Sequence, residues 1–156
     1  MSRSPFFFLE KVDGTTGKAT LVTVQILKQD GSTESVDLFP YNGCHDLFSI
    51  VEENSGDIPA MGGIHRGLPF GASDRIKQEY EFCKRYGGTF RWFFYSDLLV
   101  YSLNFPKIKS VDDEGNTIMI DNPIFALKNR VDSFIEIWDS WSGDNSLYRI
   151  VYWIDY

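Results

Sequence analysis

Cysteine and histidine are scarce in this chain, with two of each among 156 residues. Cys44 and Cys83 form no C-x-x-C motif, and two cysteines with two histidines are a poor basis for a zinc site. We therefore predict reduced, buried thiols in a cytoplasmic protein, without a metal or other cofactor. An apolar run of about 18 residues, as a membrane-spanning helix requires, is also missing. Neither secretion nor membrane insertion is expected.

Positive charge is limited and unevenly placed. The formal net charge is −7 and the sequence pI is near 4.7, which argues against coating of long nucleic acids, because such binding needs many lysines and arginines to neutralise phosphates. Residues 1–64 carry −5, residues 65–109 carry +4 and residues 110–156 carry −6. A single basic island, residues 65–109, therefore lies within an acidic chain.

The composition predicts one compact domain over residues 1–156, because 43% apolar and 16% aromatic residues suffice for one well-buried core at this length. Residue alternation and turn signals predict strands over 6–12, 20–28 and 35–39 that form a meander, and a further strand over 147–156 with both faces covered. We expect an α+β fold, in which an antiparallel sheet of this N-terminal meander and the C-terminal strand packs against about three to four helices.

Helical spacing of apolar residues predicts helices over 44–53, over 73–86 with Ser73 as the cap, and from Asn122-Pro123 onward. Trp138 and Trp141 continue the apolar stripe of the last helix, and we expect both to be structural. Residues 54–72 contain five glycines and two prolines and should form a long loop. Loops of that length are uncommon unless they serve a function.

The basic island is the candidate binding site, because it combines guanidinium groups with flat rings that suit a small anionic or base-containing ligand. We expect Arg66 and Arg91 to hold an anion while Trp92 or Tyr95 stacks on a ring, and the loop glycines to let backbone N–H groups approach. The predicted ligand-binding residues are His45, His65, Arg66, Gly67, Arg75, Arg91, Trp92 and Tyr95. No catalytic residue is predicted.

Each candidate has a structural alternative. The loop at His65 and Arg66 can be an ordinary surface loop, and one face of the aromatic run 90–95 is expected to be core. His45 beside Asp46 could act as a base, but a histidine at a helix start more often makes only a local hydrogen bond. The acidic run 112–114, followed by Gly115-Asn116, is more typical of a solvated hairpin tip than of a cation site.

Four segments together resemble a family of small phage and bacterial proteins: Asp46-Leu47-Phe48, His65-Arg66-Gly67-Leu68-Pro69 with Ser73 behind it, Ser96-Asp97-Leu98-Leu99, and 148–155. Members of that family typically open with Met-Gly-Cys-Asp-Ile-His and close on Arg-Ile-x-Phe-x-Phe-Asp. The family has no settled activity, and the resemblance implies a phage or prophage setting.

This chain departs from the family pattern at two polar motifs. Ser4-Pro5-Phe6-Phe7-Phe8 replaces the opening motif, and 89–94 replaces a His-Ser-x-Ser pair. If relatives bind a metal or catalyse through those side chains, this chain has lost that chemistry, whereas Arg91 and Trp92 suit pairing and stacking with a ligand. The departures favour a binding protein over an enzyme.

The leading hypothesis is a phage-encoded binding protein that sequesters a small nucleotide-like anion in the host cytoplasm, of which a host defence signal would be one example. The alternative is an acidic protein that inhibits a host enzyme by docking on its basic surface. A nucleotide hydrolase comes third, because no set of nucleophile, base and orienting group is found. Self-association into a homo-oligomer stays open.

Overall fold

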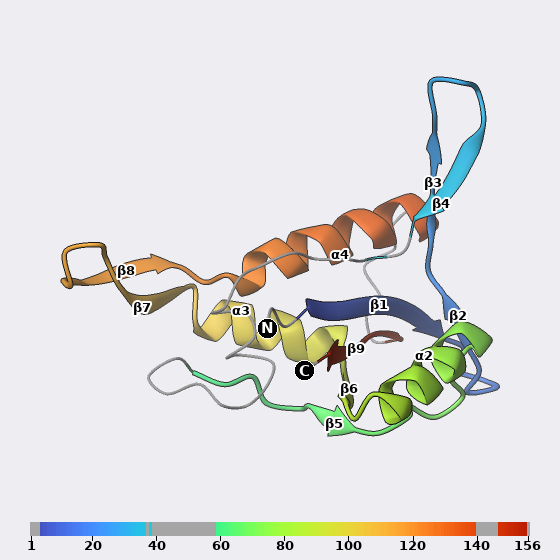
Figure 1. The fold of residues 1–156 in the computed structure, drawn as a ribbon, viewed down its shortest axis with the longest axis horizontal. Helices are drawn as coiled ribbons and strands as arrows, with labels where there is room; N and C mark the ends of the chain where they lie inside the picture. The colour runs from blue at the N-terminus through green and yellow to red at the C-terminus, as the bar shows by residue number, and fades with distance from the viewer. Residues whose placement is uncertain (1–3, 37, 39–58, 140–146, 156) are drawn as a thin grey trace.

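The computed structural model describes residues 4–36, 38, 59–139 and 147–155 (Figure 1). At its centre lies a five-stranded sheet in which all neighbouring strands are antiparallel. In spatial order its strands are β2 (Ala19–Leu21), β1 (Ser4–Val12), β9 (Tyr148–Asp155), β6 (Thr89–Phe94) and β5 (His65–Arg66).

Helices cover both faces of this sheet, so the predicted α+β class is confirmed. α2 (Asp74–Arg85) packs on one face through Ile76 and Cys83, against Phe8, Phe90 and Val151. α3 (Tyr95–Asn104) and α4 (Ile124–Asp139) pack on the other face. In Figure 1, α2 and α4 lie on opposite sides of the strands. We call these surfaces the α2 face and the α3/α4 face.

β9 occupies the centre of the sheet, as its sequence predicts. It pairs with β1 along one edge and with β6 along the other. Tyr148, Ile150 and Tyr152 belong to the core of the α3/α4 face, whereas Val151 and Trp153 belong to the core of the α2 face. Apolar residues on both sides of this strand are therefore explained by burial on both sides.

The predicted N-terminal meander is wrong as a single sheet. The segment 20–28 divides into β2, which pairs with β1, and β3 (Val24–Leu27), which pairs only with β4 (Thr33–Val36) within the described residues. Val22 lies between them at 0% exposure, and the chain then leaves the sheet. A strand pattern with a period of two indicates extended backbone but does not say which sheet the strand joins.

α2 and α4 begin close to where the sequence predicts, but the predicted side-chain cap at Ser73 is not formed. Asn122 caps α4, because its Oδ1 accepts the N–H of Ile124 at 2.9 Å. Ser73 stands before α2 without a capping side-chain bond. Its backbone N–H donates to the Glu10 carboxylate at 2.8 Å, which ties this end of the helix to β1.

Trp138 is not a core residue, which corrects its predicted structural role. Leu127 and Val131 are fully buried along α4, but the last turn exposes Ile137 by 65% and Trp138 by 40%. The helical period marks the apolar side of a helix and does not say where the layer beneath it ends. Trp141, Cys44 and the predicted helix over 44–53 lie outside the described residues.

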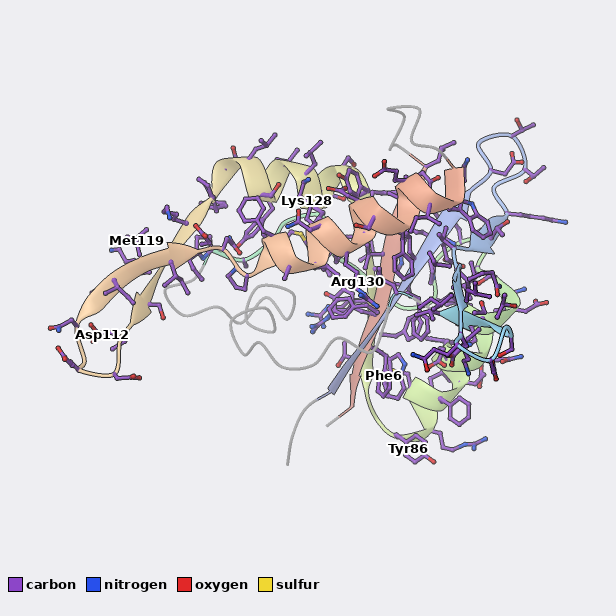
Figure 2. The ribbon with its side chains drawn as sticks, turned by 90° about the horizontal axis from the view of Figure 1, so that it is seen from above. Phe6, Tyr86, Asp112, Met119, Lys128 and Arg130 are labelled. Carbon is purple, nitrogen blue, oxygen red and sulfur yellow. The ribbon has the colours of Figure 1, made fainter. Side chains whose placement is uncertain are left out.

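Two short hairpins project from the body (Figure 1). One consists of β3 and β4, and the other of β7 (Lys107–Val111) and β8 (Thr117–Asp121). The second turns at the acidic run, where Gly115 adopts a φ of 84°, so the predicted hairpin tip is confirmed. Figure 2 shows Asp112 and Met119 on this hairpin, away from the sheet.

Candidate ligand-binding site

The two halves of the basic island meet at one edge of the sheet. The stretch His65–Arg66 is the short strand β5, which corrects its prediction as loop, since its extended backbone pairs with the edge of β6. His65 lies opposite Trp92, and Arg66 lies opposite Arg91. Because directly opposed residues share a face of an antiparallel pair, the first two lie on the α2 face and the other two on the α3/α4 face.

Four rings gather on the α2 face at this edge, and we call them the aromatic cluster: His65, Phe70, Trp92 and Phe94. The ring of His65 stacks on that of Trp92 with centroids 4.2 Å apart and an interplanar angle of 20°. Phe70 meets Trp92 edge to face at 5.7 Å, and Phe94 does so at 5.4 Å. His65 is exposed and Phe70 is 52% exposed, so half of the cluster faces solvent.

A buried ion pair lies beneath the aromatic cluster. Glu10 on β1 and Arg149 on β9 are directly opposed in register and both side chains are 0% exposed. The Nε of Arg149 donates to Glu10 Oε1 at 2.8 Å, and its Cζ lies 4.9 Å from the ring centre of Phe70 and 5.6 Å from that of Trp92. The cluster therefore rests on a buried positive charge.

Sequence reasoning missed Glu10 and Arg149, although a signal was present. Each is a charged residue in phase with buried apolar residues of its own strand, namely Phe8 on β1 and Val151 on β9. A charge at such a position requires a partner. Two strands that each carry one inward charge of opposite sign therefore indicate a buried pair in register.

The segment that carries Phe70 is held at both of its ends. At one end, Gly67 has a φ of 90° and donates its N–H to the carbonyl of Phe90 at 2.9 Å. At the other, Gly71 has a φ of 60° and its carbonyl accepts the N–H of Ala19 at 2.8 Å. A side chain at Gly71 would overlap the carbonyl oxygen of Gly17. Glycine is required at residue 71 both by this positive φ and by the lack of room for a side chain.

On the opposite face, Arg66 and Arg91 place two guanidinium groups on neighbouring strands. Arg66 is exposed, whereas Arg91 is 7% exposed and lies opposite Tyr152 of β9. Like charges that face each other across two strands repel, and negative charge placed between them relieves that repulsion. This pair is the part of the island that most resembles an anion-binding fork.

Two predicted residues lie apart from this edge. Tyr95 opens α3 at 2% exposure and donates its hydroxyl to Asp132 on α4. Burial and that hydrogen bond raise the pKa of Tyr95 above its ordinary value. Arg75 on α2 pairs with Glu79 at 3.3 Å and lies over the ring of Phe8. The structure thus brings together His65, Gly67 and Trp92 and does not join Tyr95 to them.

His45, the eighth predicted residue, lies outside the described part of the chain.

Asp97 borders the site from α3. Its carboxylate accepts the N–H of Phe94 at 3.2 Å, and a side chain at Gly63 would overlap it. Burial raises the pKa of Asp97, while the N–H of Phe94 and the nearby His65 act in the opposite direction. The hollow of about 310 Å³ beside it is lined by Gly62, Gly63, Tyr101 and Asn104 among others. A carboxylate at its wall disfavours an anion there.

Comparison with protein-family models, with curated proteins and with solved structures finds no match for this chain. Among the described residues, no group of three or more histidine, cysteine, aspartate or glutamate side chains is arranged to hold a metal ion. Within the same residues, no helix has both the length and the apolar character needed to span a membrane.

Proposed function

We propose that this protein binds a small anion that carries a flat ring, such as a nucleotide, at the sheet edge formed by β5 and β6. One observation carries the proposal: the pairing of two residues in β5 with two in β6 sets an exposed aromatic stack and an arginine pair at the same edge. His65 offers a ring surface for stacking, and Arg66 offers a planar fork for phosphate or carboxylate.

The ligand is held without turnover. Among the described residues, the groups that form this edge are aromatic rings and guanidiniums, which bind and orient a ligand but include no nucleophile next to a base. Sequestration follows from tight binding alone. The resemblance to phage proteins favours a nucleotide-like molecule of the host as the ligand, and a nucleotide defence signal would fit this chemistry.

The test is calorimetric titration of the wild type with linear and cyclic nucleotides and with the matching nucleosides. We expect nucleotides to bind more tightly than nucleosides, because the phosphate supplies the charge that Arg66 pairs with. A charge-assisted contact contributes about 1.5–3 kcal/mol, so Arg66→Ala should weaken binding roughly tenfold to a hundredfold. The ligand recovered after incubation should be intact, and a cleaved product would establish the hydrolase instead.

Arg85→Ala is the matched control, since Arg85 is an exposed arginine of the same island at the C-terminal end of α2, where it lies over the ring of Phe82. It should leave nucleotide affinity unchanged. Equal affinity of wild type and Arg66→Ala, or the absence of binding to every nucleotide, would refute the proposed site. Mass spectrometry of small molecules released by heating the purified protein identifies a ligand that copurifies.

A second candidate function, the acidic inhibitor, is supported by the hairpin of β7 and β8. Its tip carries the carboxylates of Asp112, Asp113 and Glu114, of which the last two are exposed, beyond the exposed apolar residue Val111. A projecting acidic tip suits docking on a basic surface. This candidate predicts salt-sensitive binding to poly-lysine that falls when the three tip residues become amides, together with no binding of nucleotides.

A further inference from the structure

Arg149 uses only part of its hydrogen-bonding capacity. Its Nε donates to Glu10 Oε1, whereas its two terminal nitrogens, Nη1 and Nη2, are buried and have no hydrogen-bond partner among the described residues. The other oxygen of Glu10 already accepts the N–H of Ser73. Buried polar groups are nearly always paired, so an open guanidinium fork indicates a missing acceptor. Carboxylate and phosphate are the acceptors whose geometry matches that fork.

Phe70 closes this fork off from solvent. Its ring centre lies 4.9 Å from Arg149 Cζ, and the side chain is itself 52% exposed. Trp92 covers the same guanidinium at 5.6 Å but is only 8% exposed. Trp92 is therefore a fixed wall of the space around Arg149, and Phe70 is its outer cover.

The cover can open without movement of the backbone. Pro69 is buried, and Gly71 is fixed against Gly17 and Ala19, so the chain on both sides of Phe70 is held. A half-exposed phenylalanine reaches solvent by rotation of its side chain alone, and such rotations are fast. The ring contributes a cation–π contact but no acceptor for the in-plane N–H groups, so an oxyanion can replace it.

We infer that Phe70 covers a buried oxyanion site in which Nη1 and Nη2 of Arg149 bind a carboxylate or phosphate, while a flat ring attached to that anion takes the place of Phe70 against Trp92. Arg149 lies under the aromatic cluster of the α2 face, whereas Arg66 lies on the α3/α4 face, so this site is separate from the phosphate contact of the proposed function. It does not rest on that function, because simple anions test it. It predicts the ligand class: an oxyanion close to an aromatic or heterocyclic ring.

The experiment follows the side-chain Nε–Hε resonance of Arg149 by NMR during titration with inorganic phosphate and with phenyl phosphate. Phenyl phosphate should shift this resonance in the wild type at concentrations at least tenfold lower than inorganic phosphate does, because its ring replaces Phe70. In Phe70→Ala the cover is gone, and inorganic phosphate should bind at least tenfold more tightly than it binds the wild type. Phe70→Ala removes a half-exposed side chain and keeps Arg149.

Phe82→Ala is the matched control, since Phe82 is a 47% exposed phenylalanine that also lies against an arginine, Arg85. It should leave both titrations unchanged. Arg149→Lys keeps a positive charge opposite Glu10 but removes both the fork and the Nε–Hε resonance, so its titrations are followed at the indole N–H resonance of Trp92, which lies against residue 149. A folded Arg149→Lys protein should lose the preference for phenyl phosphate.

An Arg149 resonance that neither probe moves, in the wild type or in Phe70→Ala, would overturn the inference. The two proposals fail separately. If nucleotides bind through Arg66 while the Arg149 resonance stays still, the buried site is wrong and the proposed function stands. If phenyl phosphate moves the Arg149 resonance but no nucleotide binds, the proposed function is wrong and the buried oxyanion site stands.

Discussion

Neutralising Glu10 while Arg149 remains should destabilise the protein strongly. Both side chains are 0% exposed and their charged atoms are 2.8 Å apart. Glu10→Gln leaves the guanidinium buried without its counter-charge. Removing one partner of a buried ion pair typically costs about 3–5 kcal/mol. For a chain of this length, that corresponds to a fall in the melting temperature of roughly 6–20 °C.

The size of that loss comes from burial and not from the distance between the charges. The Lys107–Asp121 pair on the β7–β8 hairpin has nearly the same separation, 2.9 Å, but its side chains are 60% and 85% exposed. Exposed pairs are typically worth about 0–1 kcal/mol. Asp121→Asn, which makes the same change from carboxylate to amide, is therefore the matched control and should stay within about 1 kcal/mol of the wild type.

The assay is urea unfolding at equilibrium, in which a change of midpoint at constant slope reports a change of stability. Replacing both partners by apolar residues, Glu10→Leu with Arg149→Met, should recover much of the loss, because the cost lies in the unpaired charge. The reasoning fails if Glu10→Gln costs no more than Asp121→Asn, or if the double variant is less stable than Glu10→Gln alone.

Three further predictions concern other parts of the fold. Leu127→Ala, at a fully buried position of α4, should cost about 2–5 kcal/mol in urea unfolding, whereas Trp138→Ala should cost well under half of that, and equal losses would return Trp138 to the core. The pKa of Tyr95 is raised in the folded protein above its ordinary value of 10.0. Its contribution to the free energy of unfolding is therefore complete below pH 10.0 and declines as pH rises from there through the higher folded pKa. Tyr95→Phe should therefore lose less stability than the wild type between about pH 9 and pH 11, and parallel losses would contradict this. Burial raises the pKa of Cys83 to about 11, so in a Cys44→Ser background its thiol should resist a thiol reagent near neutral pH until urea unfolds the chain, and fast reaction of the folded protein would refute its burial.

Periodicity predicted the elements whose surroundings are uniform along their length. β1 and β9 alternate within a sheet that is covered on both faces, and α2 presents one continuous apolar side to that sheet. Trp138 was misplaced because the layer under α4 ends before the apolar stripe does. The meander was misplaced because a strand pattern is a local property, whereas the choice between β1 and β4 as a partner is made by contacts across the whole fold.

In the candidate site, too, local sequence patterns predicted part of the arrangement, and contacts between distant segments decided the rest. Charge and ring content alone indicated that His65 and Trp92 belong to one region, and β-pairing places these two side by side. Arg149 could not be found in that way, since it lies in the acidic C-terminal block and 139 residues separate it from Glu10. Its position under the aromatic cluster depends on the register of β1 with β9, and no spacing within one segment reveals a register between two.

The place of β9 at the centre of the sheet also determines when the fold can form. β1 pairs with β9 through residues near opposite ends of the chain, and such distant contacts must overcome a large loop-closure entropy before they stabilise anything. During synthesis, β1 and β6 each lack their shared neighbour until 148–155 emerge. Phe7 and Phe93, both 0% exposed in the finished sheet, meet water in the growing chain. The sheet should therefore form in one concerted step once β9 has emerged, and the nascent chain is most prone to aggregation before β9 is available.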